Sequence, residues 1–166
     1  MSIEITDGTV ERTLIMGKPS PAIHPKTLGP IRSDLASCGP YKLVEARMIQ
    51  LNKAAVVVLT AHIRHGSPLE RATEANFMGQ IVPVFILEGV GVIDFMSKKI
   101  GERVDPSQCA EPSIRYQMYR KFGLIYEDLP YGRKYINNFF HVTRTSLEYS
   151  KHAPALITDD LLWLPF

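Results

Sequence analysis

Hydrophobic and polar positions alternate most clearly over Leu43–Leu51, where one face carries Leu43, Glu45, Arg47, Ile49 and Leu51. This period of two is typical of a β-strand, because successive side chains point to opposite sides of the backbone. Asn52-Lys53 is short enough for a hairpin turn, and the valine-rich segment Ala54–Ile63 follows it. The pattern therefore predicts two antiparallel strands joined by a tight turn.

Two later segments have the capping residues and the apolar spacing of helices. Ser67-Pro68-Leu69-Glu70 places serine at the N-cap, proline at the first helical position and glutamate at N3, and Gly79 follows. This capping box predicts a helix over residues 68–78. A second helix is predicted over Pro112–Phe122, which has apolar residues on one face and is followed by a glycine.

The remaining segments are less regular, and together they define the expected fold class. Gly17–Pro40 is rich in proline and glycine, which favours an irregular connection with a short helical turn at most. Pro83–Gly101 is ambiguous and could form a helix broken by glycines. Tyr135–Tyr149 and Pro154–Trp163 are strand-like in composition. The order of elements predicts a single α+β domain over residues 1–166, with one antiparallel sheet flanked by helices.

Two adjacent carboxylates interrupt the apolar run Pro154–Trp163. If this run is a strand, Asp159 lies on one face with Leu161 and Trp163, and Asp160 lies on the opposite face. Burying a carboxylate is costly unless the group is paired or protonated. One of these aspartates is therefore a candidate for chemistry, as a general acid with a raised pKa. The alternatives are a structural ion pair or an edge-strand aspartate that opposes aggregation.

Composition narrows the classes of function. The net charge is +2, and the chain has no basic run with interleaved aromatic residues, so we expect no nucleic-acid partner. The N-terminal residues lack the features of a signal peptide, and the apolar stretches Ala54–Ile63 and Ile81–Ile93 are too short to span a bilayer. Cys38 and Cys109 match no metal or redox motif, and we expect free thiols in a cytoplasmic protein.

Several basic residues could bind an anion. Arg47 would need an anionic partner if its strand face is the inner one, although an exposed arginine paired with Glu45 is equally possible. His62, Arg64 and His65 form a basic cluster after the second predicted strand, and they favour anion binding over zinc because no third ligand follows. The other histidines, His24, His141 and His152, are expected to be ordinary surface or core residues. The sequence contains no nucleophile elbow, P-loop or dinucleotide fingerprint, and no cofactor is predicted.

The order of short motifs resembles that of the chorismate lyase family, the chorismate–pyruvate lyases that form 4-hydroxybenzoate. The similar segments are Asp7-Gly8-Thr9-Val10, the strand Glu45–Leu51, Met78-Gly79 followed by Pro83-Val84, and Pro154–Asp159. The sequence departs from the family pattern at Asp159, where the family has glutamate, and at Phe85, where it has glycine.

The resemblance implies a chorismate lyase-like fold and a cofactor-independent carbon–oxygen lyase that releases pyruvate from chorismate or a related small cyclic acid. It implies that Arg47 clamps a substrate carboxylate and that Asp159 is the catalytic acid. It further implies that His62 or Arg64 lies at the mouth of the pocket and that Val84 forms part of its wall. Two alternatives stay open, namely a non-catalytic small-molecule sensor module of the same fold and an unrelated α+β thioester-handling enzyme.

Overall fold

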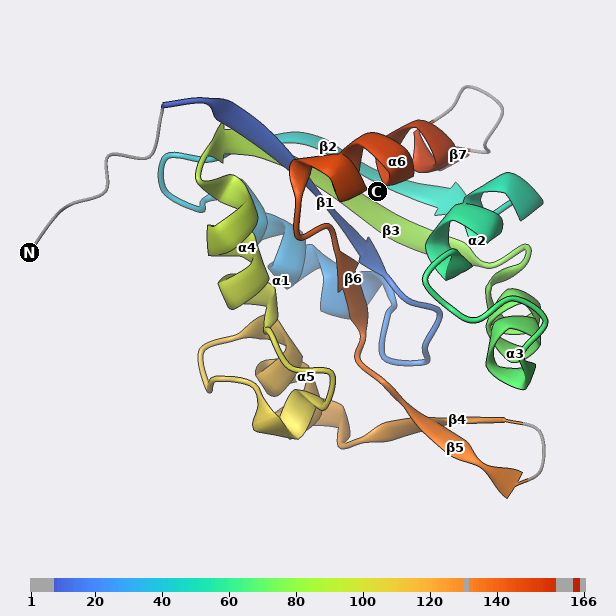
Figure 1. The fold of residues 1–166 in the computed structure, drawn as a ribbon. Coiled ribbons are helices and arrows are strands. Elements are labelled where there is room, and N and C mark those ends of the chain that lie inside the picture. Colours follow the sequence, from blue (N-terminus) through green and yellow to red (C-terminus); the bar gives the residue numbers. More distant parts are fainter. Residues whose placement is uncertain (1–7, 130–131, 158–162, 165–166) are drawn as a thin grey trace, which may run out of the picture.

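The computed structural model describes residues 8–129, 132–157 and 163–164, and its centre is a five-stranded β-sheet (Figure 1). The strands lie in the order β6-β1-β3-β2-β7, and the pairings between them are antiparallel. Their bounds are Phe140–Val142 for β6, Val10–Gly17 for β1, Ile81–Val90 for β3, Lys42–Gln50 for β2 and Trp163–Leu164 for β7. The predicted α+β class, an antiparallel sheet flanked by helices, is confirmed.

The central strand β3 divides its side chains between two hydrophobic cores. Phe85 and Leu87 pack on one face of the sheet, and Val84 and Ile86 pack on the other. The first core lies beneath the helices α1 (Pro25–Ala36), α4 (Val92–Ile100) and α5 (Ile114–Phe122). The second core lies beneath α2 (Lys53–Thr60), α3 (Pro68–Phe77) and α6 (Ser146–Leu156). The sheet is therefore covered by helices on both faces (Figure 1).

A separate hairpin leads into the edge of the sheet. It consists of β4 (Ile125–Asp128) and β5 (Lys134–Asn137), and it extends away from the main sheet before the chain enters β6 (Figure 1). A short 3₁₀ helix, η1 (Pro106–Gln108), lies between α4 and α5. These connections bring the end of α4, the start of α5 and the start of β6 close together, which matters for the site described below.

The predicted returning strand Ala54–Ile63 is wrong, because residues 53–60 form helix α2. The Asn52 side chain accepts a hydrogen bond from the Ala55 amide at 2.9 Å and caps the helix. Ala55, Val56 and Leu59 then lie on one buried face. The spacing of these buried side chains outweighs the preference of valine for strands, because propensity is weaker than tertiary burial.

Three other segments also differ from expectation. Gly17–Pro40 contains the helix α1, which begins with Pro25 in its first turn. Pro83–Gly101 contains most of β3 and then α4, since both faces of β3 are buried and its apolar run is continuous rather than alternating. In Pro154–Trp163, the first residues belong to α6, and Trp163 belongs to β7, where it pairs with Ile49 of β2. Asp159 and Asp160 lie outside the described residues.

The two predicted helices are confirmed as α3 and α5. Both begin with a serine that accepts a hydrogen bond from a backbone amide, Ser67 from Glu70 and Ser113 from Tyr116. Cys38 and Cys109 are buried free thiols, as expected. Within the described part of the chain, no helix has both the length and the hydropathy needed to cross a membrane.

The cap of α2 gives a direct test of the helix that replaces the expected strand. Asn52→Ala removes the acceptor for the Ala55 amide, and we expect the free energy of unfolding to fall by about 1 kcal/mol. Asn52→Ser retains a capping oxygen and should restore most of this loss. Urea unfolding followed by circular dichroism measures both effects. Equal stability of the alanine variant and the unchanged protein would contradict the assigned cap.

Candidate active site

One cavity of about 630 Å³ lies between the sheet edge, the α2–α3 region and the segments around β6. Its lining combines apolar side chains with a concentrated set of polar ones. The polar members that the site description uses are Lys18, His62, Arg64, Arg115, Asn138, His141, Arg144 and Glu148. Four of these are lysine or arginine and one is a carboxylate, so the described lining is strongly positive. A cavity of this size and charge suits a small polyanion.

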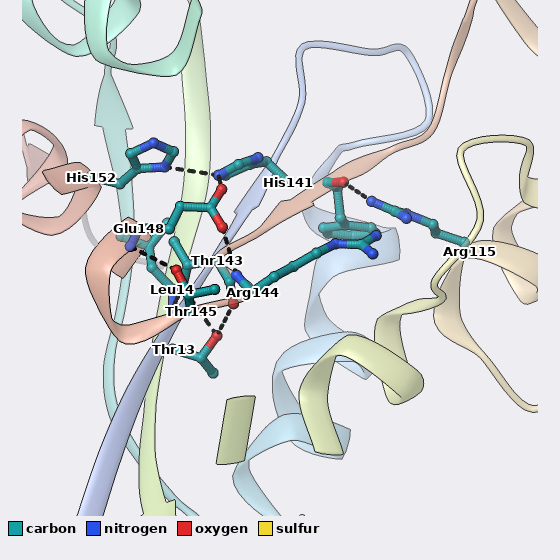
Figure 2. A network of polar contacts seen from close by, with 10 residues as sticks. Thr13, Leu14, Arg115, His141, Thr143, Arg144, Thr145, Glu148 and His152 are labelled. Carbon is teal, nitrogen blue, oxygen red and sulfur yellow. Dashed lines mark hydrogen bonds and ion pairs between the residues drawn. The ribbon is translucent and has the colours of Figure 1, made fainter. Parts of the chain in front are cut away.

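Arg115 is the most deeply buried cation of the site, with only 3% of its surface exposed. Its Nε donates to the carbonyl of Asn138 at 3.0 Å, and Nη1 donates to those of Gly101 and Arg103 at 2.6 and 3.0 Å. Nη2 donates to the carbonyl of Phe140 (Figure 2). Burial lowers the pKa of this guanidinium to about 10, which leaves it charged at neutral pH. Arg115 therefore fixes the backbone on two sides of the cavity while keeping its positive charge.

Lys18 follows the buried strand β1 and carries a second positive charge into the cavity. Its backbone amide donates to the Phe139 carbonyl at 2.8 Å. Desolvation by burial, reinforced by the charge of Arg115, lowers the pKa of its ammonium group to about 8, and Glu127 opposes this shift. No described residue forms a hydrogen bond or a salt bridge with that ammonium group. An anion in the cavity would supply the missing partner.

His141 lies on β6 and lines the cavity with a largely buried imidazole. Its Nε2 lies 2.9 Å from Nδ1 of His152 and 3.6 Å from Oε1 of Glu148 (Figure 2). Burial is the main cause that lowers the pKa of His141 to about 3, and the charges of His152 and Lys18 add to it. The ring is therefore neutral at physiological pH. Among the described residues, Nδ1 has no hydrogen-bond partner, so the second ring nitrogen can carry a free lone pair.

Helix α6 supplies both partners of the His141 ring. Glu148 and His152 are four residues apart, which places them on the same face of the helix. The Glu148 carboxylate accepts a hydrogen bond from the Arg144 amide at 2.7 Å, and the Glu148 amide donates to Thr145 Oγ1 at 3.0 Å. The start of α6 is thereby fixed relative to β6, and the two partners are held against the imidazole (Figure 2).

The backbone turns sharply just before His141. Phe139 has a φ of 64°, a region that residues other than glycine rarely occupy. The Phe140 amide donates to the Asn138 carbonyl two residues earlier at 2.7 Å, and the Phe139 amide donates to Oδ1 of the buried Asn137 at 2.8 Å. Unfavourable backbone of this kind persists where the surroundings hold it, and it is frequent at active sites.

The end of β6 is anchored to β1 by two threonines. Thr13 Oγ1 donates to the Thr143 carbonyl at 3.0 Å, and the Leu14 amide donates to Thr143 Oγ1 at 2.9 Å. Both threonines are fully buried. Together with Arg115 on the other side, these bonds hold the short strand that carries His141 at both ends (Figure 2).

The residues that the sequence singled out are distributed over different parts of the molecule. His62 and Arg64 line the cavity. Arg47 has 48% of its side chain exposed, and its Nε donates to Glu45 at 2.9 Å. Val84 is buried in the second core rather than in the cavity wall. The cavity is therefore lined by His62 and Arg64 but not by Arg47 or Val84.

The central residues of the cavity were missed by sequence reasoning. His141 and His152 were expected to be ordinary histidines, and Arg115 lay unnoticed within a helix predicted from its apolar face. The sequence did contain one indication of the cavity, namely Lys18, a cation that directly follows an apolar strand. The meeting of His141 and His152 depends on the tertiary position of α6, which a single sequence does not reveal.

Comparison with known structures identifies the fold. No family model matches the chain, and no curated protein matches it in sequence. Among solved structures, nucleoside diphosphate kinase of Borrelia burgdorferi with bound vanadate and ADP is similar, with a TM-score of 0.67 and 20% identity over 91% of this chain and 89% of that one. The enzyme of Halobacterium salinarum in complex with CDP has a TM-score of 0.67 and 18% identity over 93% and 92% of the two chains. A family protein from Babesia bovis has a TM-score of 0.68 and 20% identity over 92% of each chain.

The chain therefore has the ferredoxin-like fold of nucleoside diphosphate kinases. The resemblance to chorismate lyase is wrong, since the similar structures are phosphotransferases and no family model supports a lyase. The expected lyase activity, with chorismate as substrate and pyruvate and 4-hydroxybenzoate as products, has no support and is withdrawn. The short motifs misled because each was only a few residues long and fell on unrelated positions of the actual fold.

The low pKa of His141 predicts a loss of stability in acid. In the unfolded chain histidine titrates near 6.5, whereas the folded value is about 3. Between these values the unfolded chain binds the extra proton, so the free energy of unfolding falls as the pH falls through this window. From pH 7.5 to pH 5 this group alone should remove about 2 kcal/mol.

Nuclear magnetic resonance titration of the His141 ring measures its pKa, and urea unfolding at the two pH values measures the stability. His141→Gln should make the pH dependence shallower. A ring that titrates near the ordinary value of histidine would contradict the burial and the charges described above.

The hydrogen bonds of Arg115 predict that replacing it by lysine lowers the stability of the protein. The loss depends on the shape of the guanidinium more than on its charge. Arg115→Lys keeps the positive charge but loses the fork that reaches four carbonyls, and we expect the free energy of unfolding to fall by about 3 kcal/mol. Arg120→Lys in the same helix is the matched control, because Arg120 is exposed, and its effect should stay within about 0.5 kcal/mol. Chemical denaturation of both variants provides the comparison. Similar stabilities for the two would show that the buried fork is dispensable.

Proposed function

We propose that this protein is a phosphotransferase that moves a phosphoryl group between nucleoside triphosphates and nucleoside diphosphates through His141. The observation that carries the proposal is a buried, neutral imidazole whose Nε2 is held by other side chains inside a cavity rich in permanent cations. The solved structures of the same fold include complexes with ADP and vanadate and with CDP, which supports nucleotides as the small anionic substrates.

The chemistry requires a lone pair on one ring nitrogen and a proton on the other. When His141 Nε2–H donates to Nδ1 of His152, the lone pair resides on His141 Nδ1. This lone pair forms a nitrogen–phosphorus bond to the terminal phosphorus of the triphosphate, and the bridging phosphorus–oxygen bond breaks. The electron pair leaves with the nucleoside diphosphate. A second nucleoside diphosphate then attacks the phosphohistidine in the reverse reaction, so the protein is regenerated.

The cations supply binding and charge stabilisation. In phosphoryl transfer, negative charge spreads over the oxygens of the transferred group and the leaving group, and fixed positive groups stabilise it. Lys18 and Arg115 line the same cavity as His141, so both can stabilise the negative charge of the phosphoryl group. Arg64 and Arg144 line the same cavity and would bind the remaining phosphates.

The nucleoside would occupy the less polar part of the cavity. Leu59, Ile63, Leu69 and Tyr135 belong to its lining and offer apolar surface and one aromatic ring against which a base can pack. Contacts of this kind carry little information on the identity of the base. The bound ADP and CDP of the similar structures agree with such weak selection in this fold.

The decisive test is phosphorylation of the protein itself. Incubation with ATP labelled at the terminal phosphate, in the presence of magnesium, should give a labelled protein whose label is lost in acid and retained in base, as expected for phosphohistidine. Added unlabelled GDP should remove the label and form labelled GTP. His141→Gln should reduce both label and transfer to background, because the nucleophile is absent.

His65→Gln is the matched control, because His65 is fully exposed and is not part of the cavity lining. This variant should be labelled as efficiently as the unchanged protein. Label that persists in His141→Gln would place the nucleophile elsewhere. Tight binding of a fluorescent ADP analogue without any label would reject phosphotransfer and indicate a nucleotide-binding protein.

A further inference from the structure

The contact between β6 and α6 places three metal-ligating side chains around one point. His141 Nε2, Glu148 Oε1 and His152 Nδ1 all lie within 4.8 Å of one another. We propose that these three atoms form a binding site for Zn²⁺, and that the metal and the phosphoryl group compete for the use of the same imidazole. The site is distinct from the His62 and His65 pair that the sequence analysis considered, and it draws its ligands from two elements far apart in the chain.

The distances are close to those that zinc requires. Zinc–nitrogen and zinc–oxygen bonds are about 2.0–2.2 Å long, so the ligand atoms at the corners of a tetrahedral site are about 3.3–3.5 Å apart. In the structure, Nε2 of His141 lies 2.9 Å from Nδ1 of His152 and 3.6 Å from Oε1 of Glu148. Separations of a few tenths of an ångström on either side of the ideal need only small side-chain rotations.

The ligand set is also the chemistry that zinc prefers. Two imidazoles and one carboxylate supply three protein ligands, which leaves the fourth position for water or for a phosphate oxygen. Glu148 is oriented by the Arg144 amide through a hydrogen bond at 2.7 Å, so its carboxylate has the kind of supporting contact that metal sites use. His152 is nine-tenths buried, which limits competition from bulk water.

The charges around the three ligand atoms limit the strength of metal binding. Lys18, Arg115 and His62 act on His141 and oppose a second positive charge, whereas Glu148 favours it. We therefore expect one site of moderate affinity rather than a permanently loaded structural zinc.

Metal binding has a specific consequence for the His141 ring. In the hydrogen-bonded pair, one proton lies between Nε2 of His141 and Nδ1 of His152. Zinc needs the lone pairs of both atoms, so this proton must leave that contact. If the His141 ring stays neutral, its proton moves to Nδ1, which is the nitrogen whose lone pair the proposed phosphotransfer uses. This second step rests on the proposed function, and it predicts that zinc inhibits formation of phosphohistidine.

Isothermal titration of the purified, metal-free protein with Zn²⁺ tests the site independently of activity. We expect one zinc per chain, and Co²⁺ as a probe should give the intense visible absorption of four-coordinate cobalt bound to nitrogen and oxygen. His152→Gln and Glu148→Gln should each weaken zinc binding about tenfold or more, because each removes one of three ligands. His65→Gln is the matched control, since His65 also contacts a carboxylate, that of Glu70 at 3.2 Å, but is fully exposed.

Unfolding curves of each variant show whether lost binding reflects lost structure, and Glu148→Gln keeps an oxygen that can accept from the Arg144 amide. Absence of zinc binding, or binding that His152→Gln leaves unchanged, would overturn the site. Zinc binding with the expected variant pattern, in a protein that is never phosphorylated, would retain the site and reject the proposed function. Phosphorylation that saturating zinc does not slow would retain the function and reject the competition.

Discussion

The buried guanidinium of Arg115 is the interaction on which the candidate site depends most. Its hydrogen bonds join the carbonyl groups after α4 to those at the start of β6, two segments that lie far apart in the sequence. Two of these carbonyls, those of Asn138 and Phe140, flank the unfavourable φ of Phe139. Hydrogen bonds from Arg115, a side chain of helix α5, therefore help to hold this turn. Because His141 follows the turn directly, the position of the imidazole is set by the same contacts.

The site also has an unbalanced charge distribution. Within the described residues, Arg115 donates to carbonyl oxygens and Lys18 has a more distant attraction to Glu127, so neither cation is neutralised there by an adjacent carboxylate. Burial makes such charges costly, as the lowered pKa values of both groups show. A polyanion that enters the cavity would offset the free-energy cost of burying these two charges. This gain would contribute to the free energy of binding. Moderate stability in exchange for affinity is a common compromise at functional sites.

The sequence predicted those parts of the fold that local chemistry determines. Helices α3 and α5 follow from Ser67 and Ser113, whose hydroxyl groups cap them, and β2 follows from simple alternation. Helix α2 and strand β3 could not be identified in this way, because both bury valine and other large apolar residues and only the packed structure distinguishes the helical period from the strand period. For the site, the sequence cluster singled out His62 and Arg64, which line the cavity, whereas His141 and His152 meet only through the packing of α6 on the sheet.

The choice of a histidine as the partner of His141 has a chemical consequence of its own. A carboxylate at 2.9 Å would stabilise the imidazolium and raise the pKa of His141, whereas His152 lowers it, and Glu148 lies farther away at 3.6 Å. The imidazole is therefore unprotonated over the whole physiological range, but it is also a weaker base than usual. In the proposed reaction, bound phosphates would offset the charges of Lys18 and Arg115 that lower the basicity of the ring, and would thereby raise its nucleophilicity. Under the proposed function, substrate binding and activation of the nucleophile are thus parts of one electrostatic change, which links the positive cavity to the neutral imidazole.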